Sequence, residues 1–246
     1  MKIVVVPGIN GLGVTQGVEK SYLEVLERQD FEKINLNNGN IEEQLEQIVG
    51  GTKRYFNGGK VLFFGGDHSI SYGLVLNFFE KYKNGKLIVF DAHPDLMEQM
   101  PEPGHEEWLR AVVEKTGIDG KRILIVGVRK NSENVDKREI DYAKEKGIKI
   151  IYSDEFDSRR EEILEFIGSG ELYCSFDIDV FDSSIIASTG YPEENGLNEG
   201  QMFRLLEEIG EKINYFDLVE VNLEKGSEEE KKRTRDVVEK VLSEFG

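Results

Sequence analysis

The strongest constraint on the fold of this chain is a repeated pattern in which a short apolar run is followed by an amphipathic stretch of helix length. Runs such as VLFF at 61–64 and LIVF at 87–90 are apolar at every position, as in strands that helices cover on both faces. The alternation predicts an α/β protein with a parallel sheet. We predict strands near residues 2–7, 31–35, 60–65, 86–91, 122–128, 148–152, 171–178 and 215–221.

The amphipathic stretches complete the predicted fold, and no linker or internal repeat divides them. Residues 1–246 are therefore predicted to form a single domain. Its expected architecture is three-layer α/β/α, with a parallel sheet of roughly eight strands. Helices are predicted near residues 16–28, 40–55, 69–83, 105–117, 133–146, 155–168, 200–212 and 227–245.

The charge of the chain narrows the choice of partner. Its formal net charge is −17 at pH 7. Nucleic acids and anionic membranes are bound mainly through Lys and Arg. We therefore expect neither as a partner, and a small cationic substrate is the more natural ligand.

Cysteine content and the first residues favour a cytoplasmic protein. Cys174 is the single cysteine, so no internal disulfide forms, and its place in a predicted strand indicates an inert buried thiol in a reducing compartment. The opening apolar run is broken by Pro7 and Gly8, which leaves it too short for a signal peptide or a membrane span.

Three short segments at predicted strand ends concentrate possible metal ligands. They are GGDHS at 65–69, DAHPD at 91–95 and SFDID at 175–179. Ligands of open α/β sheets bind outside the carboxyl ends of the strands, so we expect these segments to meet. The acids and the histidine in the last two recur at a spacing of two, which on an extended strand would turn their side chains to one side.

The acidic residues of these segments require a positive charge. Four aspartates cannot share a dry cleft unless a cation holds them together. Two divalent ions would balance four carboxylates, with two imidazoles neutral. The candidate ligands are His68, Asp91, His93, Asp95, Asp177 and Asp179.

Some of these residues have ordinary structural alternatives. Asp67 and Ser69 could cap the following helix, which would leave His68 as a polar turn residue. His105, the third of three histidines, lies in the loop after DAHPD. It is either a residue at the start of the next helix or a proton-transfer group, because histidine titrates near neutral pH.

Together the three segments resemble the arginase/agmatinase (ureohydrolase) family. Its patterns GGDHS, DAHxD and SxDxDxxDP appear in the same order at 65–69, 91–95 and 175–182. GVEKSYLEVL at 17–26 is similar to the first helix of the family, and LVEVN at 218–222 is similar to a late strand. The resemblance covers nearly the whole chain and implies an arginase-like fold.

The resemblance implies a centre of two Mn(II) ions per chain. Asp91 and Asp177 would bridge the ions. An oxygen-rich set with two imidazoles suits Mn(II), although Fe, Co and Ni remain open. Two cations lower the pKa of bound water, and the family's reaction is attack of this water on a guanidinium carbon, which gives urea and an amine. The implied ligands are His68, Asp91, Asp95 and Asp177 for one ion, and Asp91, His93, Asp177 and Asp179 for the other.

The resemblance also implies catalytic roles. Glu220, in the family's late glutamate position, would bind the guanidinium through charge-assisted hydrogen bonds. Alternatively, Glu220 is an acid at the end of a strand at the sheet edge, with no catalytic role. His105 would take the place of the proton-shuttling histidine. Asp95 is counted both as a metal ligand and as a catalytic residue.

Two long loops, 92–104 and 180–199, are expected to recognise the substrate. Glu98 in the first loop and Thr189 in the second are candidate substrate-binding residues. The segment LMEQMPEPG before His105 lacks the Asn, Ser and Thr with which arginases typically bind the amino-acid end of their substrate. This favours agmatine, cleaved to putrescine in polyamine biosynthesis. Arginine and guanidinobutyrate remain alternatives.

The chain also departs from the family pattern near these loops. Glu106 follows His105 where a small residue is usual, Ser183 and Ser184 stand where Pro is frequent, and STGYPEENG at 188–196 replaces ATGTPxxGG. These departures leave the candidate ligands intact.

Three other functions compete with a ureohydrolase. A two-metal phosphoesterase would need a phosphate-binding loop or a basic cluster, and the sequence has neither near the motifs. A single-zinc deacetylase does not need six ligands. A catalytically silent, metal-stabilised binding protein stays open because of the unusual residues His105 and Glu106. By resemblance, the chain is expected to form a homo-oligomer, either a trimer or a hexamer.

Overall fold

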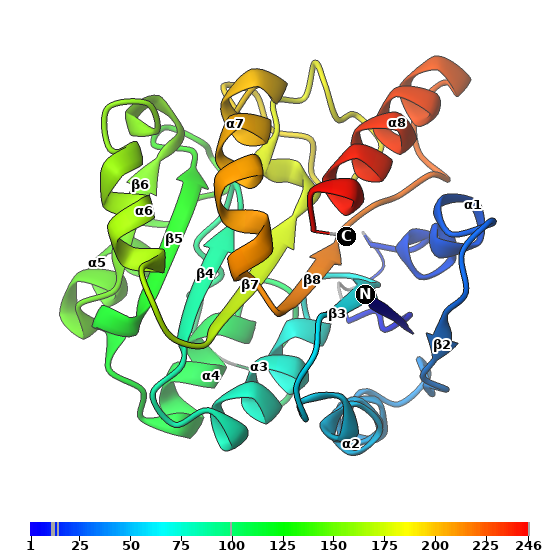
Figure 1. Ribbon diagram of the computed structural model, residues 1–246, viewed down its shortest axis with the longest axis horizontal. Helices are drawn as coiled ribbons and strands as arrows, with labels where there is room; N and C mark the ends of the chain where they lie inside the picture. The colour runs from blue at the N-terminus through cyan, green and yellow to red at the C-terminus, as the bar shows by residue number, and fades with distance from the viewer. Residues whose placement is uncertain (11–12, 14, 99, 246) are drawn as a thin grey trace.

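Eight parallel strands form one sheet in the computed structural model, which describes residues 1–10, 13, 15–98 and 100–245 (Figure 1). The strand order is β2-β1-β3-β8-β7-β4-β5-β6. This confirms the predicted class and the sheet of about eight strands. The strands are β1 Lys2–Val6, β2 Glu32–Lys33, β3 Val61–Gly65, β4 Lys86–Phe90, β5 Ile123–Val128, β6 Lys149–Tyr152, β7 Leu172–Asp177 and β8 Tyr215–Val219.

Helices cover both faces of the sheet, which gives the predicted three layers (Figure 1). They are α1 Tyr22–Val25, α2 Ile41–Thr52, α3 Ile70–Lys81, α4 Trp108–Thr116, α5 Lys137–Lys146, α6 Arg160–Ile167, α7 Glu199–Ile209 and α8 Glu228–Phe245. One core cluster joins α1, α6, α7 and α8 to a face of the sheet, and another joins α2, α3, α4 and α5 to the opposite face. Successive residues of β1 alternate between the two clusters, which explains why such strands are apolar at every position.

The region after β1 departs from the prediction. Residues 16–28 form a 3-10 turn at Val18–Lys20 and the short α1 instead of one long helix. Between them, the hydroxyl of Ser21 accepts a hydrogen bond from the backbone N–H of Leu223 at 3.0 Å, which ties this bend to the segment after β8. The predicted strand at 31–35 is reduced to β2, whose two residues are exposed at the edge of the sheet.

Cys174 is buried within β7, as predicted. Among the residues that the structure describes, no helix combines the length and the apolar character that crossing a membrane requires.

Four neighbouring strands, β3, β8, β7 and β4, bring the predicted motifs to one edge of the sheet. Residues 65–69 include the end of β3 and the turn after it, Glu220 follows β8, Asp177 ends β7, and Asp91 follows β4. Because all four strands are parallel, their carboxyl ends lie together. Segments that are distant in sequence are therefore adjacent at this edge.

Candidate metal centre and substrate cavity

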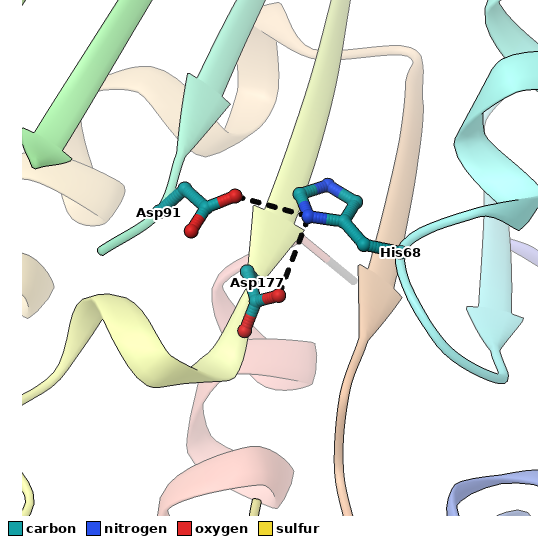
Figure 2. Close-up of side chains that lie close together, drawn as sticks. All are labelled: His68, Asp91 and Asp177. Atoms are coloured by element: carbon teal, nitrogen blue, oxygen red, sulfur yellow. Dashed lines mark ion pairs between the residues drawn. The ribbon is translucent and has the colours of Figure 1, made fainter. Parts of the chain in front are cut away.

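His68 lies at the centre of a first group of candidate ligands. Its Nδ1 is 3.0 Å from Oδ2 of Asp91 and 3.3 Å from Oδ2 of Asp177. Figure 2 shows both carboxylates beside the imidazole ring. Oδ2 of Asp95 lies 2.9 Å from the same nitrogen. All four side chains are buried. His68, Asp91 and Asp177 each offer a ligand atom, and these atoms lie within 4.8 Å of one another, which is close enough to hold one metal ion.

A second group shares Asp91 with the first. Nδ1 of His93 is 3.4 Å from Oδ1 of Asp91 and 3.1 Å from Oδ2 of Asp179. These three residues also offer ligand atoms within 4.8 Å of one another. Asp91 therefore faces the first group with Oδ2 and the second group with Oδ1. Its bridging role, and that of Asp177, stay predictions.

The candidate ligands converge through turns, which corrects the expectation of side chains aligned along extended strands. Of the acids in these motifs, Asp177 belongs to a strand, Asp91 follows β4, and Asp179 lies in the 3-10 turn Ile178–Val180. Asp95 has a φ of 52°, a left-handed conformation that is uncommon for residues with a side chain. The indole Nε1 of Trp108 donates a hydrogen bond to Oδ2 of Asp95 at 2.7 Å and holds it in place.

Gly66 and Asp67 fix the turn that carries His68. A Cβ at position 66 would lie 1.8 Å from the carbonyl oxygen of Gly8, so this close approach requires glycine. Asp67 accepts hydrogen bonds from the loop after β1 and from Ser69. Ser69 precedes α3 but makes no side-chain capping bond. The capping alternative for Ser69 is therefore wrong.

The pKa values of this cluster show how strongly it requires positive charge. Burial raises the pKa of Asp177 well above its ordinary value, and the charges of Asp179 and Asp91 raise it further. Burial and Asp91 raise the pKa of Asp95 to about 7. Burial lowers the pKa of His68, but the surrounding carboxylates outweigh this effect and bring it well above its usual value. The cluster needs either protons or metal cations, and its oxygen and imidazole donors fit divalent metal ions.

Glu220 is a buried acid that contacts the candidate ligand His68. Its φ of 64° is again left-handed, and such conformations concentrate at functional sites. Oε1 accepts a hydrogen bond from the backbone N–H of His68 at 2.9 Å. Oε2 is buried and has no hydrogen-bond partner within the described part of the chain. Burial and Asp67 raise the pKa of this carboxyl well above its ordinary value, so a cationic ligand would stabilise its charged form.

His105 stacks on Tyr191 near these ligands. The ring centroids are 5.9 Å apart and the planes differ by 16°. Tyr191 also meets His93 edge-on, with centroids 6.2 Å apart. Among the residues described, none forms a hydrogen bond with Nε2 of His105, and the carboxylate of Glu106 is 3.8 Å away. The proton-transfer role of His105 stays a prediction.

A cavity of about 260 Å³ lies beside the candidate ligands and has an acidic wall. His93, Asp95, His105 and Tyr191 line part of it. No lysine or arginine occurs among the described residues that line it. Such a wall favours a cationic ligand. The other lining carboxylates are Glu106, Glu133, Asp136 and Glu139.

A sequence model described as the arginase family matches residues 9–245. The chain belongs to the arginase family. Agmatinase of Chromobacterium violaceum is 33% identical over 168 residues, which cover 67% of this chain and 51% of that protein. Guanidinobutyrase of Pseudomonas aeruginosa is 27% identical over 190 residues, which cover 74% and 57%. The chain thus spans about half the length of these curated relatives.

Solved structures confirm the arginase-like fold. The proclavaminate amidino hydrolase from Streptomyces clavuligerus superposes with a TM-score of 0.84 at 22% identity, over 99% of this chain and 91% of that one. At this identity the likeness shows the fold alone.

The two loop residues predicted to bind the substrate, Thr189 and Glu98, lie in different surroundings. Thr189 is buried, and its backbone pairs with Val221 beyond β8. Its hydroxyl forms no hydrogen bond with the described residues. Glu98 is exposed and is not among the residues that line the cavity. Both substrate-binding roles stay predictions.

Three residues make contacts at the site that were not predicted. Oε1 of Glu193 lies 3.5 Å from Nε2 of His93, Tyr191 contacts both His93 and His105, and Trp108 donates a hydrogen bond to the candidate ligand Asp95. Glu193 and Tyr191 lie in the segment 188–196, where the sequence departs from the usual family pattern. That departure was the available signal, but it did not reveal which side chains the loop would contact.

Proposed function

We propose that this chain is a binuclear metal hydrolase that cleaves a guanidino compound to urea and an amine, and that its substrate is agmatine. One arrangement carries the proposal. Asp91 faces two ligand groups with different oxygens. Glu220 is anchored on the backbone of His68 through Oε1, and its Oε2 has no hydrogen-bond partner among the described residues. We assign the activity to a single arginase-like domain, residues 1–246.

The two ligand groups would hold two Mn(II) ions per chain, because they offer carboxylates and imidazoles and no thiolate. When bound, these ions would supply a water of lowered pKa. Asp91 and Asp177 would contribute to both metal positions. The proposed ligands are His68, Asp91, Asp95 and Asp177 for one ion, and Asp91, His93, Asp177 and Asp179 for the other.

Glu220 would bind and orient the guanidinium. A planar cation with several N–H donors satisfies a carboxylate oxygen that lacks a partner. Because Oε1 is already bonded to the backbone of His68, Oε2 is the oxygen left for the substrate. The substrate carbon would in this way be oriented relative to the metal ligands.

His105 would transfer a proton to the leaving nitrogen. It lines the same cavity as His93 and Asp95, and its Nε2 lacks a hydrogen-bond partner in the described structure. Histidine can exchange a proton near neutral pH. Asp95 completes the proposed catalytic set, held by its hydrogen bond from Trp108.

The acidic cavity supports agmatine over the alternatives. The named relatives include an agmatinase and a guanidinobutyrase, so family membership leaves the substrate open. The ammonium end of agmatine would lie among carboxylates, whereas arginine and guanidinobutyrate would bring a carboxylate of their own toward them. Thr189 and Glu98 are proposed to contact the substrate from the two long loops. With putrescine as product, the reaction would belong to polyamine biosynthesis.

We further propose that the protein works in the cytoplasm as a homo-oligomer, a trimer or hexamer as the family resemblance implies. Its net charge of −17 disfavours nucleic acid and anionic membranes as partners. The molar mass in solution, measured by light scattering, tests the oligomeric state.

Urea release by the Mn(II)-loaded chain tests the proposal, with agmatine, arginine and 4-guanidinobutyrate compared side by side. We expect kcat/KM to be highest for agmatine by at least about tenfold, the factor that corresponds to 1.4 kcal/mol. A preference for 4-guanidinobutyrate would overturn the substrate assignment. No urea from any of the three, with two ions bound, would favour the catalytically silent alternative.

A further inference from the structure

Asp217 is a fully buried carboxylate that the proposed reaction does not use. It lies in β8, upstream of Glu220, and none of its surface is exposed. Its Oδ2 accepts hydrogen bonds from the hydroxyls of Tyr173 at 2.7 Å and Ser71 at 2.9 Å. Its Oδ1 accepts one from the hydroxyl of Ser175 at 2.7 Å. These donors offset the cost of burying the carboxylate.

Ser175 extends this network to His68. Ser175 and Asp217 are partners in register on the adjacent strands β7 and β8. Oγ of Ser175 lies 2.9 Å from Nε2 of His68. A serine hydroxyl has one proton, and here it is donated to Asp217, so the oxygen is left to accept a hydrogen bond from Nε2–H. Nδ1 is then the nitrogen that would bind an ion held between His68, Asp91 and Asp177.

We propose that Asp217 is a positioning residue that acts through Ser175 to fix the tautomer and the ring orientation of His68. The inference rests on the proposed metal centre, in which Nδ1 of His68 is a ligand. A metal-binding histidine carries its proton on the other nitrogen, and the partner of that nitrogen orients the ring and raises its basicity. Asp217 therefore helps to set the affinity of the ion that His68 binds, without contacting that ion.

A second hydrogen-bond donor to Asp217, Tyr173, provides a matched control for the variants of Ser175 and Asp217. Ser175→Ala removes the link between Asp217 and His68, and Asp217→Asn replaces the carboxylate with an amide. Tyr173→Phe removes a hydrogen bond from the other oxygen of Asp217 and leaves the bond to Ser175 in place. A general loss of buried hydrogen bonding would affect all three variants alike.

The test titrates the metal-free full chain with Mn(II) and records thermal unfolding of the same samples. We expect Ser175→Ala and Asp217→Asn to lower the Mn(II) affinity of one of the two metal positions by about 10- to 100-fold. Tyr173→Phe should lower the unfolding temperature, and both of its Mn(II) affinities should stay within about threefold of the wild-type values. If Asp217→Asn does not fold, Ser175→Ala decides the question alone.

Unchanged Mn(II) affinities in Ser175→Ala would overturn the inference, and so would an equal loss of affinity in Tyr173→Phe. The titration contains no substrate, so its result is separate from that of urea release. A wild-type chain that binds two ions without hydrolysing any guanidino compound would overturn the proposed reaction alone. A wild-type chain that binds no Mn(II) would overturn both.

Discussion

The backbone N–H of His68 donates a hydrogen bond to Oε1 of Glu220 at 2.9 Å, so a single contact joins a candidate metal ligand to the acid proposed to bind the substrate. The two residues follow the neighbouring strands β3 and β8. Oε2 of this buried carboxylate has no hydrogen-bond partner among the residues that the structure describes. The backbone of His68, a candidate metal ligand, therefore anchors the carboxylate that would hold the guanidinium.

Glu220→Gln should keep both metal ions and lower kcat/KM for agmatine by about 30-fold or more, because a buried charge that pairs with the guanidinium is lost. Steady-state urea release and metal analysis of one sample measure this. Glu224→Gln is the control, since Glu224 is an exposed acid nearby that pairs with Lys20. A kcat/KM that Glu220→Gln leaves unchanged would remove Glu220 from substrate binding.

His105→Asn should retain the metal ions and reduce kcat by about 100-fold or more, the usual range for a lost proton-transfer group. Tyr191→Phe preserves the aromatic ring on which His105 stacks and should change kcat much less. The comparison requires turnover at saturating agmatine. Equal turnover in His105→Asn and the wild type would exclude the proton-transfer role.

Glu133→Gln should raise KM for agmatine by about two- to fivefold, the effect of an exposed charge pair. It should leave KM for 4-guanidinobutyrate unchanged or lower, because that substrate has no distal ammonium. Glu161→Gln provides an exposed control outside the cavity. The same change for both substrates would show that the acidic wall does not select a cation.

The buried acid Glu139 should make stability depend on pH. Burial raises its pKa from 4.5 to about 7. Because the folded state binds the proton more tightly, this contribution is fully present below about pH 4.5 and is lost as the pH rises through about 7. Between about pH 5 and 8.5, the free energy of unfolding of the wild type should fall by roughly 1–3 kcal/mol relative to Glu139→Gln.

Denaturant unfolding of both proteins at the two pH values measures this difference. Glu145→Gln, an exposed acid of the same helix, serves as the control. A stability difference between Glu139→Gln and the wild type that is equal at both pH values would contradict the prediction.

Much of the fold could be predicted because burial on both sheet faces leaves a direct trace in the sequence. The run VLFF lies within β3 and LIVF lies within β4. Alternate residues of these strands point to opposite faces of the sheet, and both faces are buried. The bend within residues 16–28 could not be predicted. It depends on the hydrogen bond between Ser21 and Leu223, a contact between distant segments with no local signal.

The candidate site could be predicted as three segments but not as a geometry. Parallel strand ends meet at one edge, so a cluster of these ligands follows from the order of the motifs. The left-handed backbone of Asp95 depends on tertiary contacts such as its bond from Trp108. Likewise, the contacts of Tyr191 and Glu193 with His93 depend on how a long loop folds back over the sheet edge.

Metal stoichiometry and urea release of Asp91→Asn test the shared metal centre most directly. We expect the wild type to bind two Mn(II) ions per chain and to release urea from agmatine. Asp154→Asn, an exposed control, should behave in the same way. Asp91→Asn should lose metal binding and activity, because one carboxylate faces both ligand groups. Two ions retained by Asp91→Asn, with urea release intact, would contradict a metal centre built on Asp91.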